Sequence, residues 1–419
     1  MFNNNNLSLN KEILFLIFLY ISLIISFFVG ENSTGGAIID YTNQKFISLD
    51  FASNFTDTLF NYDNYSTRHS PILIIFLSIF EKVNLDDFVI RLIHLHLGLL
   101  LPYYFFKILE IRFKSIKKNY LILLVGLVFL SPTFRSLCIW PDSRLLGLTF
   151  FTMSVYYFLK FKENKDFNYV YINIFTCALS AYISPNFSVF SLFFFYYYVK
   201  FYSFFSKKIF LIIFLNIIFA LPAFYYVFFL EINFLNKSAA ININENDRVF
   251  FHNIFNDLLI TFSIIFFYLF PFLIGKIIKF SNILTKSNIL ISIILFALCV
   301  YFFNYNYEYS GGGIFFKFSN FIFENNFFFY FLGFFSILIC FPYFLKNREN
   351  LIIFLLILLN NPQYTLYHKY FDPFLLILFF SLFNFEISLK ENKTKNFYFI
   401  YSYFLIFLIL SNLKHSWIT

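Results

Sequence analysis

One carboxylate stands directly after the first apolar segment of the chain. Asp40 follows a Gly-Gly pair, and this flexible stretch keeps the acid close to the end of that segment. A carboxylate in this position can act as a general base on a hydroxyl acceptor or coordinate a divalent cation. The simpler interpretation is a solvated loop acid, which also fits three more aspartates of the same stretch, Asp50, Asp57 and Asp63.

Two basic side chains precede the short apolar stretch 70–83, which we expect to form an interfacial or re-entrant helix. Arg68 and His69 stand at its start. A helix N-terminus and a guanidinium both favour anions, so a phosphate is a candidate ligand. Anchoring to lipid headgroups explains the same residues equally well.

A third group of polar residues stands at the start of another apolar segment. Asp142 and Arg144 follow Trp140 and Pro141. Trp140 is one of only two tryptophans in the chain. The pattern predicts Asp142 as a helix N-cap with a structural salt bridge to Arg144. The alternative is a polar group that reaches into a catalytic cavity, and the residues leave both interpretations open.

The loop 361–373 interleaves tyrosines with His368 and Lys369. Lys369 is well placed to contact a phosphate. Tyr367 and Tyr370 can stack on sugars, or belong to the aromatic belt at a membrane interface.

Membrane-spanning helices must position these residues. The 419-residue chain is 60% hydrophobic and only 13% charged, with a mean hydropathy of +0.72, whereas soluble proteins have about 45–50% apolar and 25% charged residues. The long apolar runs suit helices and not the short alternating strands of a barrel. We expect an all-α polytopic membrane protein with about thirteen spans, near residues 12–29, 87–109, 120–132, 144–160, 169–183, 187–205, 209–230, 254–275, 288–303, 327–345, 351–360, 373–389 and 397–411.

The charges predict an orientation. With 70–83 lying on the surface and the N-terminus in the cytoplasm, most of the 31 basic residues fall on the cytoplasmic side and most of the 23 acids outside. The longest outer loop is then 30–86. We expect a protein of the bacterial inner membrane, or its equivalent, with its site on the non-cytoplasmic face. The dispersed cations argue against a nucleic-acid partner, and the scattered cysteines against a disulfide or metal framework.

Several short motifs occur in an informative order. They are an acidic motif ending at Asp40, Arg-His-Ser-Pro at 68–71, Asp-Asp-Phe-Val-Ile-Arg-Leu at 86–92, and Leu-Ser-Pro-x-Phe-Arg at 130–135. Together they resemble the GT-C superfamily, the polytopic glycosyltransferases that use polyprenyl-phosphate-linked sugars. Protein mannosyltransferases and bacterial aminoarabinose lipid A transferases belong to it. The resemblance covers roughly Gly30–Lys160 and, more loosely, the loop Tyr367–Pro373.

The resemblance implies a single integral-membrane domain, with a core over 1–345 and C-terminal spans over 346–419. It implies that Asp40 and Asp142 are the catalytic acids. Many relatives have an Asp-Glu pair where this chain has Ile39-Asp40-Tyr41, so a divalent cation is an option and no cofactor is certain. The expected contacts to the donor phosphate are Arg68, His69, Arg144, His368 and Lys369, and those to the sugar or acceptor are Tyr41, Tyr367 and Tyr370.

The expected function is therefore transfer of a sugar from a polyprenyl-phosphate donor to a lipid, glycan or protein acceptor by an inverting single displacement. A multi-span transporter or a lipid or glycan flippase is the alternative, although such proteins place ionisable residues near the bilayer midplane. A polymerase or ligase of lipid-linked glycans is a third possibility, but its largest outer loop usually comes late in the chain.

Overall fold

The computed structural model describes residues 11–65, 67–232, 253–279, 285–306, 311–363, 365–388 and 394–416, and these are mainly helical. The predicted all-α class is confirmed. The exception is a short antiparallel pair of strands, β1 (Ile278–Lys279) and β2 (Glu386–Ile387). Residues 1–10, which include the N-terminal end predicted to lie in the cytoplasm, are outside the described ranges.

The N-terminal part contains the elements around Asp40 and His69. They are α1 (Lys11–Val29), α2 (Ala37–Ser53), α3 (Phe55–Phe60), η1 (Tyr62–Tyr65), α4 (Pro71–Lys82), α5 (Asp87–Gly98), α6 (Leu100–Arg112), α7 (Lys118–Gly126), η2 (Leu127–Leu130) and α8 (Pro132–Ile139). Most of the predicted loop 30–86 is thus helical. The stretch 70–83 forms α4, which at 12 residues rises about 18 Å and is too short to cross a hydrocarbon core of about 30 Å.

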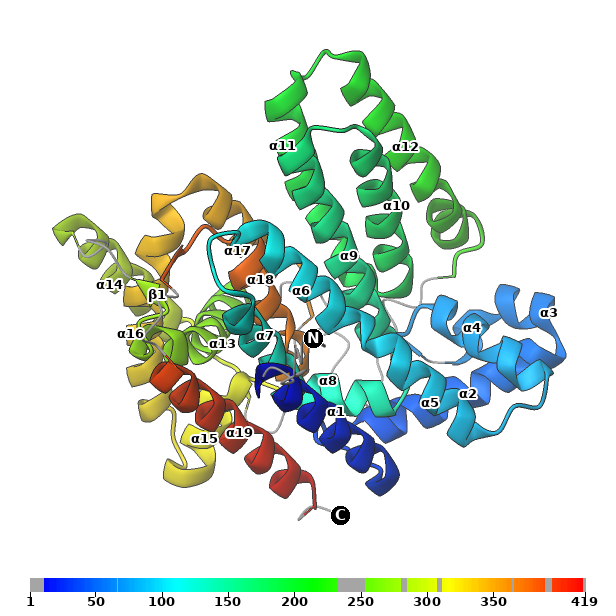
Figure 1. Cartoon of the computed structure of the whole chain (residues 1–419), viewed down its shortest axis with the longest axis horizontal. Helices are drawn as coiled ribbons and strands as arrows, with labels where there is room; N and C mark the ends of the chain where they lie inside the picture. The colour runs from blue at the N-terminus through cyan, green and yellow to red at the C-terminus, as the bar shows by residue number, and fades with distance from the viewer. Residues whose placement is uncertain are drawn as a thin grey trace, which may run out of the picture.

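The remaining helices form two further groups. The first is α9 (Ser143–Asn164), α10 (Asn168–Ile183), η3 (Pro185–Phe190), α11 (Ser191–Tyr202), α12 (Lys207–Phe224) and the π-helical turn η4 (Tyr225–Phe229). The second is α13 (Ile254–Ile274), α14 (Lys286–Tyr301), α15 (Gly313–Phe323), α16 (Phe327–Lys346), α17 (Arg348–Leu359), η7 (His368–Tyr370), α18 (Phe374–Ser381) and α19 (Thr394–Ser416). Figure 1 shows α9 to α12 as a bundle that projects from the rest, with α2 to α4 beside its base and α13 to α19 on the other side.

The number of spans differs from the sequence-based count. Within the described ranges, six helical segments are long and apolar enough to cross a bilayer, and a seventh is added if α7–η2 and α8, bent by 66°, count as one. The six are Lys11–Val29, Asp87–Arg112, Lys207–Phe229, Ile254–Ile274, Phe327–Lys346 and Asn396–Lys414. The structure therefore supports transmembrane helices and does not confirm thirteen. Several apolar runs, such as 187–205 and 373–389, contain turns and yield helices of only 12 and 8 residues.

Helix starts follow the local sequence. Ser70, Asp86, Ser131 and Asp142 each accept a hydrogen bond from a backbone N–H in the first turn of the helix they precede. Such side chains satisfy amide groups that a helix leaves without an internal partner. The N-cap predicted at Asp142 is confirmed.

Buried polar side chains join the helices. Asn173 of α10 donates to the carbonyl of Ser154 at 2.8 Å and accepts from the Tyr198 hydroxyl at 2.9 Å. Near the end of α1, Glu31 pairs with Arg135 of α8, with 2.9 Å between Oε2 and Nη2. The first set of contacts joins α9, α10 and α11, and the ion pair joins α8 to the segment after α1.

Candidate functional site

The centre of the candidate site is a contact between two segments far apart in the chain. Asp40 lies in the first turn of α2, and the Nζ of Lys369, in η7, donates to its Oδ2 at 2.9 Å. Gly36 lies beside this pair: a Cβ added to it would be 3.8 Å from both atoms. An added methyl group at position 36 would thus be in ordinary van der Waals contact with both partners of the pair.

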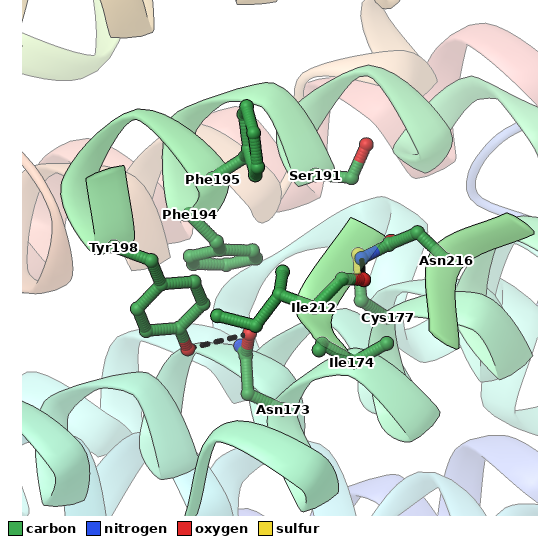
Figure 2. Close-up of a pocket in the computed structure, with 9 residues that line it drawn as sticks. All are labelled: Asn173, Ile174, Cys177, Ser191, Phe194, Phe195, Tyr198, Ile212 and Asn216. Carbon is green, nitrogen blue, oxygen red and sulfur yellow. Dashed lines mark hydrogen bonds between the residues drawn. The ribbon is translucent and has the colours of Figure 1, made fainter. Parts of the chain in front are cut away.

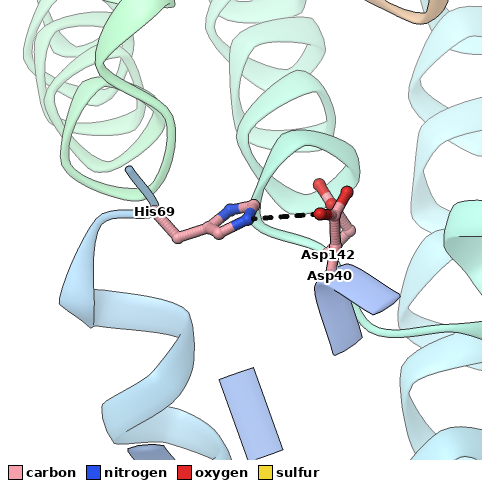
Figure 3. A group of neighbouring side chains, drawn as sticks. All are labelled: Asp40, His69 and Asp142. Carbon is pink, nitrogen blue, oxygen red and sulfur yellow. Dashed lines mark ion pairs between the residues drawn. The ribbon is translucent and has the colours of Figure 1, made fainter. Parts of the chain in front are cut away.

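His69 and Asp142 complete the cluster. One ligand atom each of Asp40, His69 and Asp142 lies within 4.8 Å of the other two. The Nε2 of His69 is 4.0 Å from Oδ1 of Asp40, and its Nδ1 is 3.3 Å from the hydroxyl of Ser143. Figure 3 shows the imidazole, just before α4, pointing toward both carboxylates, which come from α2 and from the start of α9.

Arg144 brings a further positive charge to the site. The backbone N–H of Arg144 donates to Oδ1 of Asp142 at 2.7 Å, and its guanidinium carbon lies over the ring of Tyr370, 3.5 Å from the centroid. The Tyr370 hydroxyl donates to Oε1 of Gln363 at 3.3 Å. Stacking on an aromatic ring orients a guanidinium and leaves its edge available to an anion.

The charges of the cluster control its ionisation. Asp142 is only 3% exposed, and burial alone would raise its pKa. The charges of His69, Lys369 and Arg144 and the N–H of Arg144 outweigh that effect, so its pKa is lowered. Burial would likewise lower the pKa of Lys369, but Asp40 and other neighbours raise it. Both groups are therefore ionised at neutral pH.

No family model, curated protein or solved structure matches this chain. The chemistry of the cluster must therefore be judged from its own geometry.

The structure does not bring every expected site residue into this cluster. Tyr41, next to Asp40, points elsewhere: its hydroxyl donates to Asp87 and its ring lies 6.0 Å from that of Trp140. The imidazole of His368 is hydrogen-bonded to the Tyr268 hydroxyl at 2.9 Å. Both side chains lie away from the contact between Asp40 and Lys369.

Tyr367 lies beside the cluster, and Arg68 is adjacent to it in the sequence. The ring of Tyr367 meets that of Tyr370 edge to face, with 5.4 Å between centroids, and Nζ of Lys369 is 5.7 Å from the Tyr367 ring. Arg68 is partly buried and immediately precedes His69. Its contact with a donor phosphate stays a prediction.

Some residues of the site were not singled out from the sequence. Ser143 contacts His69, and its position directly after an N-cap was the only available signal. Asp372 is buried and binds the start of α8, accepting from the Ser131 hydroxyl at 2.6 Å and from the Thr133 N–H at 3.0 Å. Its position three residues after Lys369 indicates why this contact matters: it helps to fix the loop that carries the lysine.

The ligand set suits a divalent cation in its chemistry. Two carboxylates and an imidazole are ligands that zinc and manganese accept. However, the ammonium of Lys369 already supplies a positive charge to Asp40 at 2.9 Å. A cation and this ammonium would thus compete for the same carboxylate.

Proposed function

We propose that this chain is a membrane glycosyltransferase that moves a sugar from a polyprenyl-phosphate donor to a hydroxyl acceptor. The observation that carries the proposal is the convergence of Asp40 with Lys369, beside Asp142 and Arg144. These residues come from three distant segments. Carboxylates for proton transfer next to fixed cations for a leaving phosphate are the groups that such a reaction requires.

Asp40 is the general base of the proposed reaction. It accepts the proton of the acceptor hydroxyl while that oxygen bonds to the anomeric carbon. The bond from this carbon to the phosphate oxygen breaks at the same time, and polyprenyl phosphate leaves with the electron pair. A single displacement of this kind inverts the anomeric configuration.

Lys369 and Arg144 bind the phosphate of the donor in this proposal. Negative charge grows on the phosphate as the sugar leaves, and cations held in a partly buried site stabilise that charge more than water does. Asp142 caps α9 and thereby holds the backbone of Arg144. The rings of Tyr367 and Tyr370, which are in contact with each other and near both cations, suit a sugar face.

A divalent cation is part of the proposal only as an option. Asp40, His69 and Asp142 would hold it, and it would supply charge stabilisation at the donor phosphate. The pairing of Lys369 with Asp40 means that Lys369 must move aside for such binding. The phosphate group of the donor offers Lys369 a second partner.

The proposed orientation places this site on the non-cytoplasmic face, with the N-terminus in the cytoplasm. Its support is the excess of basic residues in the loops that the sequence-based topology assigns to the cytoplasmic face. Single cysteines introduced at Asp57 and Lys346, in a chain with its own cysteines replaced, test it by labelling intact cells with a membrane-impermeant maleimide. Labelling of position 57 and not 346 is expected, and the reverse pattern would refute the orientation.

The activity itself is tested with purified protein in lipid nanodiscs. Polyprenyl phosphates carrying different radiolabelled sugars are supplied with a mixture of membrane lipids and glycans, and labelled products are separated. Transfer that is lost in Asp40→Asn supports the proposal. A protein that moves lipid-linked sugar across a vesicle bilayer but forms no new glycosidic bond would instead be the transporter or flippase that the sequence left as the alternative.

A further inference from the structure

A groove lies between α11 and α12, outside the charged cluster. Its volume is about 290 Å³. Apolar side chains supply most of its wall, from Leu192 and Phe195 on α11 and from Ile213, Ile217 and Ala220 on α12. The groove therefore offers a hydrocarbon surface along about two turns of α12.

The two polar residues of the groove direct their donors to the backbone. The hydroxyl of Ser191 donates to the carbonyl of Ser188 at 2.7 Å, and the side-chain amide of Asn216 donates to the carbonyl of Ile212 at 2.8 Å. The Ser191 hydroxyl and one N–H of the Asn216 amide thus have partners within the protein. The rest of the wall is apolar and suits an apolar chain.

A second, smaller pocket shares Ser191, Phe195 and Asn216 with the groove. Figure 2 shows this pocket, in which Asn173 and Tyr198 are hydrogen-bonded to each other. The space there is about 10 Å³, which is roughly the room that one water needs. A long occupant must therefore lie along the helices and cannot pass between them.

One wall of the groove belongs to a helix that is apolar enough to cross a bilayer. Lys207–Phe229, which includes α12, has a mean hydropathy of 2.3, and only 11% of its most apolar window is buried within the protein. A helix of this kind suits contact with the hydrocarbon of a bilayer, so the groove suits a lipid chain better than a soluble ligand.

A short chain of contacts joins the groove to the charged cluster. The hydroxyl of Tyr182, near the end of α10, donates at 2.6 Å to the carbonyl of Phe219, the neighbour of Ala220. The carbonyl of Tyr182 in turn accepts from the hydroxyl of Ser70, the N-cap of α4. Ser70 directly follows His69 of the cluster. One residue therefore separates the end of the groove from a segment that lines the charged site.

We infer that this groove binds the hydrocarbon chain of the lipid whose phosphate is held by Lys369 and Arg144. The inference rests on the proposed function. It names the place where the hydrocarbon chain of the polyprenyl-phosphate donor lies. The volume is near the lower limit of ligand sites, about 300–1,000 Å³, so the groove holds a segment of the chain and the rest extends into the bilayer. Recognition of the donor is then divided between a charged head site and an apolar chain site.

Photochemical labelling tests the position of the chain. The intact protein in nanodiscs is irradiated with a polyprenyl monophosphate that carries a diazirine in its chain, and labelled peptides are mapped by mass spectrometry. We expect label on α11 and α12 that excess unlabelled polyprenyl monophosphate removes and excess phosphatidylglycerol does not. Label on other helices, or equal removal by both lipids, would overturn the inference. This measurement requires no sugar transfer, so it judges the groove even if the proposed activity fails.

Variants of α12 give the second test. Ala220→Trp fills the groove, whereas Leu221→Trp adds the same side chain at a position that is 54% exposed and does not line the groove. We expect Ala220→Trp to raise the KM for a long-chain polyprenyl-phosphate sugar at least tenfold and to leave the KM for its citronellyl analogue unchanged. Leu221→Trp should affect neither. An equal effect of Ala220→Trp on both donors would refute a chain site, whereas absence of transfer by the unaltered protein would refute the proposed function.

Discussion

Lys369 and Asp40 are 329 positions apart in the chain, and a hydrogen bond of 2.9 Å joins them. The bond links the first turn of α2 to the loop before α18. Since each group partly neutralises the other, an anion that binds Lys369 weakens its hold on Asp40. In the proposed reaction, the donor phosphate would therefore help to free the base that the acceptor needs.

Replacing Asp40 should abolish transfer without unfolding the protein. Asp40→Asn removes the base and keeps the size of the side chain. We expect kcat to fall by about 10²- to 10⁴-fold, the usual contribution of a positioned general base, with an unchanged elution profile in detergent. Asp57→Asn is the matched control, because Asp57 lies in the same part of the chain and bonds instead to Asn61 at 2.8 Å. Full activity of Asp40→Asn would exclude Asp40 as the base.

Replacing Lys369 should expose the carboxylates to cations. In Lys369→Ala the ammonium no longer competes for Asp40, so we expect Mn²⁺ to bind at least tenfold more tightly than to the unaltered protein. Two opposite unit charges 4 Å apart attract each other by about 4 kcal/mol at an effective dielectric constant of 20. Loss of an attraction of this size is enough for such a change in affinity. Isothermal titration calorimetry measures it, and the double variant with Asp40→Asn should lose the gain. Equal affinities in all three proteins would show that no cation binds at this cluster.

The pair of Glu31 and Arg135 should make stability depend on pH. Burial alone would raise the pKa of Glu31, but the hydrogen bonds and charge of Arg135 outweigh it and lower that pKa below its usual value of 4.5. A carboxyl group with a lowered pKa stabilises the fold above its unfolded pKa, and this contribution is lost as the pH falls through the folded value. The melting temperature in detergent should therefore decrease as the pH is lowered below about 5.

Glu31→Gln isolates this contribution. Removing one partner of a buried ion pair costs about 3–5 kcal/mol, so the variant should melt at a lower temperature at pH 7 and lose much of the dependence on acid. Glu324→Gln is the control, since Glu324 is exposed. Identical melting curves for Glu31→Gln and the unaltered protein from pH 3 to 7 would contradict the expectation.

Asp372 should be needed for its oxygen atoms more than for its charge. Burial raises the pKa of Asp372 above its usual value, although its hydrogen bonds from Ser131 and Thr133 act in the opposite direction. Asp372→Asn keeps an acceptor oxygen, whereas Asp372→Ala leaves two buried donors without a partner, at about 1–3 kcal/mol for each. We expect the alanine variant to be clearly less stable in thermal unfolding than the asparagine variant. The reverse order would show that the negative charge itself is required.

The sequence by itself determined the class of the protein and several local features. Apolar runs require helices because a bilayer offers no partners for backbone polar groups, and the short side chain of Asp142 before Ser143 predicts the cap that the structure contains. His94 and His96, two positions apart in α5, point in different directions and bond to the carbonyl of Leu137 and to Tyr20 respectively. Each of these features depends on residues a few positions apart, where helix geometry alone decides the outcome.

Only the tertiary structure decided which candidates meet. Asp40 and Tyr41 are neighbours in the chain, yet successive residues of a helix point about 100° apart, so one faces Lys369 and the other Asp87. The same divergence separates Lys369 from His368, whose imidazole bonds to Tyr268. The span count also exceeded what the structure supports, because an apolar run does not show where a turn interrupts the helix. Pairing of distant residues depends on how helices pack, and no local pattern specifies that.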